Sequence, residues 1–137
     1  MPRYAAERVL LAPVEDVWAF VAEPYHLSDW WPGISGVEPD RRGMAAGARW
    51  QVLRPSYTRK PETPGVLVVH AVEPRRRFAF ELLRERAVAE LLLRPLDARR
   101  TEASLAVTFP WWNIFNGTLP KQALRRLYDL IQTAAEL

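Results

Sequence analysis

The sequence has no cysteine among its 137 residues. Disulfide bonds, a thiolate nucleophile and cysteine-ligated zinc are therefore excluded. A chain without cysteine also suits a reducing compartment. Histidine is almost as scarce, and the two histidines, His26 and His70, show no metal-ligand spacing. The sequence therefore predicts no metal site and no cofactor.

Long apolar runs are missing as well. Residues 1–11 lack the apolar core of a signal peptide because Arg3, Glu7 and Arg8 interrupt them. No apolar stretch approaches the roughly 20 residues that cross a bilayer as a helix. We therefore expect a soluble, cytoplasmic protein without a membrane span.

Motifs for phosphate binding and nucleophilic catalysis are absent. There is no glycine-rich phosphate loop, no Gly-x-Ser-x-Gly turn and no paired-carboxylate motif. The net charge of +3 gives only a weak steering field. Arginines cluster at predicted turns, at strand starts and on the solvent-exposed face of one predicted helix. Aromatic residues do not alternate with them, as they do in proteins that bind single-stranded nucleic acid by stacking. No nucleic-acid partner is expected.

The chain is rich in aromatic and other apolar side chains. Hydrophobic residues make up 49% of it, and six of its residues are tryptophan. A domain of this length buries about two-thirds of its unfolded surface. Because no repeat, linker or low-complexity tract divides the chain, we expect one domain over residues 1–137.

The first third of the sequence predicts a strand and two helices. Arg3–Leu11 is the strand. Pro13 then opens a helix over Val14–Ala22, where its missing N–H costs nothing. Tyr25–Trp31 can form a second, shorter helix before Pro32-Gly33 breaks it.

From residue 37 to residue 109 the apolar pattern has a period of two, which is typical of strands with one dry face. Short connections between these strands imply antiparallel neighbours. The predicted strands are Val37–Arg42, Ala48–Arg54, Gly65–Glu73, Arg76–Arg84, Ala87–Leu96 and Thr101–Phe109.

The last segment, Pro120–Leu137, predicts a long amphipathic helix. It is the only predicted element long enough to cover the dry face of the sheet. The fold class is therefore α+β: a curved seven-stranded antiparallel sheet with two short helices, and a long C-terminal helix over a cavity.

This order of elements resembles the START-like superfamily, also called SRPBCC or Bet v 1-like, and within it the polyketide cyclase/dehydrase-type families. The stretches that carry the resemblance are Leu11–Trp18, His26–Pro32, Glu73–Phe80, and Leu93–Leu96 followed by Thr101. The resemblance implies a helix-grip fold with a cavity for hydrophobic small molecules. It does not imply one activity, because the superfamily includes cyclases, lipid carriers, oxygenase domains and co-chaperones.

The candidate ligand-binding residues are those predicted to line the cavity or its rim. Tryptophan suits a flat ligand because it offers a large apolar face and one N–H donor. The same side chains could instead fill the space as a plug. The candidates are Trp30, Trp31, Trp50, His70, Phe80, Leu91, Phe109, Trp111, Trp112, Leu124 and Tyr128.

No catalytic set is evident, and His70 and Tyr128 are the only candidates for moving a proton. His70 enters the cavity if it shares a face with Val66 and Val68. In the other register Leu67 and Val69 point inward and His70 meets water, and the sequence does not choose between the two. Glu81 and Glu90 are expected on the solvated face.

Three functions remain open at this stage. The preferred one is binding of a small hydrophobic molecule that is aromatic, polyketide-like or lipid-like. The second is a cyclase/dehydrase-type enzyme acting in the same cavity. The third is a protein-interaction domain of the co-chaperone or toxin–antitoxin type, which an exposed apolar rim at Trp111 and Trp112 would favour. The oligomeric state is not predicted.

Overall fold

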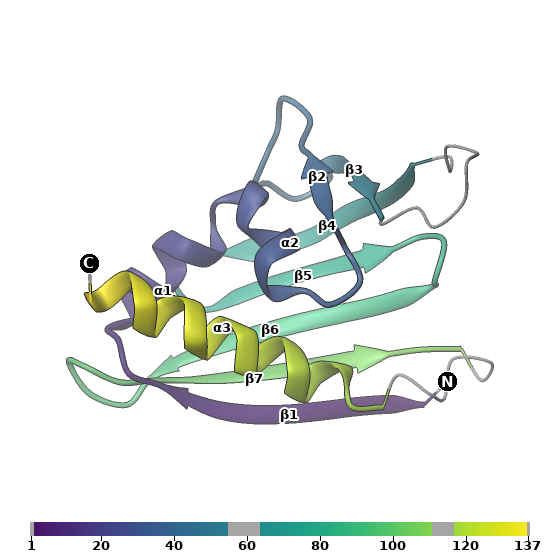
Figure 1. The fold of residues 1–137 in the computed structure, drawn as a ribbon. Helices are drawn as coiled ribbons and strands as arrows, with labels where there is room; N and C mark the ends of the chain where they lie inside the picture. Colours follow the sequence, from purple (N-terminus) through teal and green to yellow (C-terminus); the bar gives the residue numbers. More distant parts are fainter. Residues whose placement is uncertain (1, 55–63, 111–116, 137) are drawn as a thin grey trace.

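The computed structural model describes residues 2–54, 64–110 and 117–136 (Figure 1). Its sheet has seven antiparallel strands in the order β1-β7-β6-β5-β4-β3-β2. The strands are β1 (Arg3–Leu10), β2 (Gly36–Glu38), β3 (Arg49–Leu53), β4 (Gly65–Glu73), β5 (Arg77–Leu82), β6 (Ala87–Pro95) and β7 (Thr101–Thr108). From β2 to β7, consecutive strands are neighbours. β1 breaks this order, because it joins the far edge of the sheet beside β7.

The helices are α1 (Val14–Val21), the 3-10 turn η1 (Pro24–His26), α2 (Leu27–Trp30) and α3 (Leu119–Glu136). Figure 1 shows α3 crossing one side of the sheet in front of β7 and β1, with α2 next to it. Pro13 has an extended backbone and starts α1, and Glu15 and Asp16 complement the helix dipole in its first turn. The helix-grip arrangement of the α+β fold is confirmed.

Two predicted elements differ from expectation by more than a residue or two at their ends. The short helix predicted over Tyr25–Trp31 is the turn η1 followed by α2. The strand predicted over Val37–Arg42 stops at Glu38. The Asp40 carboxylate ends it by accepting hydrogen bonds from the backbone N–H groups of Arg42, Gly43 and Arg49. Such a side chain competes with the strand ladder for backbone donors.

The core lies between the inner face of the sheet and the helices. Residues of β6 and β7 alternate between buried and more exposed positions, as the period of two predicts. The buried residues of α3 include Ala123, Leu124, Leu127 and Ile131. The apolar face of the sheet is thus covered by the C-terminal helix, as the sequence predicts.

Candidate functional site

Five aromatic side chains form a continuous contact chain on the inner face. Ring centroids are 6.0 Å apart for Trp50 and Phe78, and 4.9 Å apart for Phe78 and Phe80. Trp31 lies edge-on to Phe80 at 5.1 Å and to Trp30 at 5.9 Å. All five are buried. Of the candidate ligand-binding residues, Trp30, Trp50 and Phe80 therefore pack as core.

Trp31 also reaches an open pocket, which we call the mouth pocket. Its volume is about 200 Å³. It lies where the α2–β2 connection meets the ends of β3 and β7, the β5–β6 turn and the start of α3. It is lined by Trp31, Pro32, Gly33, Ile34, Arg54, Leu82, Glu85, Ala87, Phe109 and Leu119. The mouth pocket thus brings together two of the predicted ligand-binding residues, Trp31 and Phe109.

The charged part of this wall is an ion pair between Arg54 and Glu85. The two side chains are in contact and are 19% and 27% exposed. Arg54 comes two residues after Val52, so it continues the inward alternation of Trp50 and Val52 along β3. A long charged side chain at that position keeps its stem on apolar surface and its guanidinium at the rim.

His70 lies outside this arrangement. Its side chain is 48% exposed, and Nε2 lies 3.1 Å from Oε1 of Glu81. The register of β4 against β5 shifts between Val69 and Ala71, so His70 occupies a bulge. The buried residues of β4 are Gly65, Leu67 and Val69, which is the register that turns His70 toward solvent.

Tyr128 faces the edge of the sheet. Its ring lies under the Arg8 guanidinium, whose carbon is 4.5 Å from the ring centroid. This cation–π contact joins α3 to β1, and Tyr128 does not line the mouth pocket. Leu91 and Leu124 are buried in the core. Trp111 and Trp112 lie outside the described residues.

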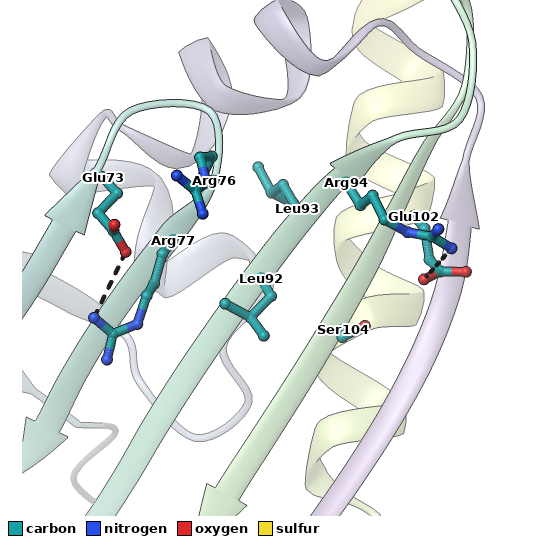
Figure 2. A pocket seen from close by; sticks show the side chains of 8 residues that line it. All are labelled: Glu73, Arg76, Arg77, Leu92, Leu93, Arg94, Glu102 and Ser104. Atoms are coloured by element: carbon teal, nitrogen blue, oxygen red, sulfur yellow. Dashed lines mark hydrogen bonds and ion pairs between the residues drawn. The ribbon is translucent and has the colours of Figure 1, made fainter.

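A larger pocket of about 370 Å³ lies on the outer face of the sheet, and we call it the outer groove (Figure 2). Arg77 is paired there with Glu73 and Glu90, and Arg94 with Glu102. The hydrogen bond to Glu90 raises the pKa of the Arg77 guanidinium above its ordinary value. Apart from Leu92 and Leu93, the residues that line the outer groove are charged or polar, so it is the weaker candidate for a hydrophobic ligand.

Two further features bear on the site. Within the described residues, no three histidine or carboxylate side chains come together in a way that could hold a metal ion. No helix in the described part of the chain is long and apolar enough to cross a membrane.

Residues 1–133 match the model of the family described as polyketide cyclase/dehydrase and lipid transport. The chain belongs to this family. Comparison with curated proteins yields no match. The match to the cyclase/dehydrase and lipid transport family, together with the helix-grip fold, places the chain in the START-like superfamily.

Solved structures share the fold of this family member. Protein XoxI of Bacillus cereus has a TM-score of 0.74 at 13% identity, covering 98% of this chain and 99% of the other. A protein of Nitrosomonas europaea has a TM-score of 0.72 at 17% identity, and the match covers 98% of this chain and 97% of the other. A protein of Deinococcus radiodurans has a TM-score of 0.69 at 20% identity, and the match covers 98% of this chain and 97% of the other. At these identities the likeness shows the fold alone.

Sequence reasoning missed Arg54 and Glu85. The signal for Arg54 was present, because it is the next inward position after Trp50 and Val52. A charged residue in an otherwise apolar inward series marks a place where the interior opens. Glu85 gave no such signal, since it lies in a turn where the period of two ends.

Proposed function

We propose that this family member binds a small hydrophobic molecule in the mouth pocket. The observation that carries the proposal is an open pocket at the end of a packed core, where the buried side chains of Trp31, Ile34 and Phe109 meet the ion pair of Arg54 and Glu85. Apolar pockets with a few polar groups are the usual form of small-molecule sites. Membership of a family described by polyketide and lipid chemistry supports the same class of ligand.

The size of the pocket limits the ligand. An apolar cavity of roughly 150 Å³ takes up benzene, so about 200 Å³ suits one ring or the end of a short chain. The part of a larger aromatic or lipid-like molecule that enters would be of this size.

The described residues favour a binding function over a catalytic one. The titratable side chains that line the mouth pocket are Arg54 and Glu85, and they are paired with each other. His70 lies on the solvated face of the sheet. The interaction-domain alternative rests on Trp111 and Trp112, which lie outside the described residues.

The test uses toluene and indole as neutral probes, observed by saturation-transfer NMR. Leu119→Trp fills the mouth from the start of α3 and is expected to abolish the transfer signal. Leu92→Trp is the matched control, because Leu92 is exposed on the outer groove. If Leu92→Trp abolished binding and Leu119→Trp did not, the mouth pocket would be the wrong site. Native mass spectrometry of protein purified from its own host then identifies a co-purifying molecule.

A further inference from the structure

The wall of the mouth pocket changes character between its two sides. Trp31, Ile34 and Phe109 form an apolar side, while Arg54 and Glu85 bring a cation and an anion to the side made by β3 and the β5–β6 turn. A molecule that fills the pocket would therefore meet apolar surface with one end and a guanidinium with the other.

Only part of the Arg54 guanidinium has an interaction partner among the described residues. Glu85 contacts Nη2. Nη1 is buried and has no hydrogen-bond partner among the described residues. A buried donor without an acceptor is destabilising, so a small movement of Arg54 that brings this edge of the guanidinium to an acceptor is favoured.

Gly65 makes room for this guanidinium. A Cβ built on Gly65 would lie 2.8 Å from Nη1 of Arg54. Gly65 is itself buried and pairs with Val52 across β3 and β4. The missing side chain at position 65 thus lets Arg54 lie against the sheet at the rim of the pocket.

We propose that the ligand of the mouth pocket is an amphipathic acid, a proposal that rests on the function proposed above. Its carboxylate accepts hydrogen bonds from Arg54, and its apolar body contacts Trp31 and Phe109. The Glu85 carboxylate contacts the same guanidinium and competes with the ligand for it.

The chemistry of the charged side supports an acid over a neutral ligand. A guanidinium offers a planar fork of donors that matches a carboxylate.

The experiment compares phenylacetate with phenylacetamide, which have nearly the same shape and differ in charge. Calorimetry gives the Kd of each, and the ratio of the two isolates the charge. The unchanged protein is expected to prefer the acid. Arg54→Met is expected to reduce this preference about tenfold, the size of a charge-assisted hydrogen bond. Glu85→Gln is expected to raise it about threefold, the size of a partly exposed ion pair.

The matched controls are Arg94→Met and Glu102→Gln, which break a similar ion pair in the outer groove. Neither should change the ratio. A preference that fell with Arg94→Met would move the acid site to the outer groove and overturn the proposal.

Two results separate this inference from the function on which it rests. Equal binding of acid and amide, unaltered by Arg54→Met or Glu85→Gln, overturns the acid class and leaves the hydrophobic site standing. Failure of toluene, indole and both phenyl compounds to bind overturns both. If Arg54→Met does not fold, Glu85→Gln carries the test, and an unchanged ratio in that variant contradicts the proposal.

Discussion

The hydroxyl of Thr101 donates a hydrogen bond of 2.8 Å to the backbone carbonyl oxygen of Ala12, and both residues are buried. The bond joins the first residue of β7 to the connection between β1 and α1, 89 positions earlier in the chain. Thr101 is the buried polar residue of an otherwise apolar core among the described residues. This contact therefore ties the connection that leads into α1 to the start of β7.

Replacing Thr101 with valine keeps the volume and leaves the Ala12 carbonyl without its partner. A buried acceptor left unpaired costs about 1–3 kcal/mol. We expect the free energy of unfolding in urea to fall by that amount. Thr108→Val, at the more exposed end of the same strand, should change it by less than about 0.5 kcal/mol. Equal losses in the two variants would contradict the role given to the buried bond.

Phe80 lies at the middle of the aromatic contact chain, between Phe78 and Trp31. Phe80→Ala leaves a cavity that the surrounding rings fill only in part, and such changes cost about 3–5 kcal/mol. The measurement is again the free energy of unfolding in urea. Leu92→Ala removes an exposed leucine from the outer face and serves as the control. A small effect of Phe80→Ala would show that the rings form a loose lining and not a packed core.

Asp40 makes stability depend on pH in acid. The backbone N–H of Arg49, and then those of Gly43 and Arg42, hold the pKa of the Asp40 carboxyl below its ordinary value of 3.8. A carboxyl with a lowered folded pKa stabilises the fold above pH 3.8 and loses that contribution as the pH falls through the folded pKa.

Asp40→Asn should therefore be less stable than the unchanged protein at pH 7, and the difference in Tm should shrink as the pH is lowered below 3.8. Thermal unfolding followed by circular dichroism between pH 7 and pH 2 measures this. Asp129→Asn, which alters an exposed carboxylate on α3, is the comparison. A Tm difference that stayed constant with pH would rule out the carboxylate as the cause.

His70→Ala should leave both stability and ligand binding nearly unchanged. The side chain is exposed and contacts Glu81 on the neighbouring strand, so the expected change in stability is within about 0.5 kcal/mol. The same toluene and indole measurements report on binding. Loss of probe binding in this variant would show that His70 acts on the pocket despite its place on the outer face.

The fold could be predicted from the sequence because the signals were periodic and agreed with one another. Alternation along Thr101–Thr108 and the apolar stripe of α3 each point to a single dry interface. The end of β2 could not be predicted, because it depends on Asp40 reaching Arg49 across a turn. The direction of His70 depends on a bulge, which adds one residue to a strand without any mark in the apolar pattern.

The candidate site was harder to predict than the fold, because it too depends on contacts between residues that are distant in the sequence. Trp30, Trp31, Trp50 and Phe80 were expected at a cavity, and residue type alone does not separate a lining from a plug. Their mutual contacts favour a packed core, and Trp31 alone of the four reaches the mouth pocket. The pairing of Arg54 with Glu85 joins β3 to the β5–β6 turn, which only the folded sheet brings together.

The position of β1 beside β7 has a consequence for the order of events during synthesis. Arg3 pairs with Thr108 and Leu10 with Thr101, so β1 has no neighbour in the sheet until about a hundred further residues have been made. At roughly 5–20 residues per second this takes about 5–20 s. Throughout that interval Leu10, which is buried in the finished fold, lacks its neighbour Thr101. Of the seven strands, β1 is thus made first and cannot enter the sheet before β7, which is made last.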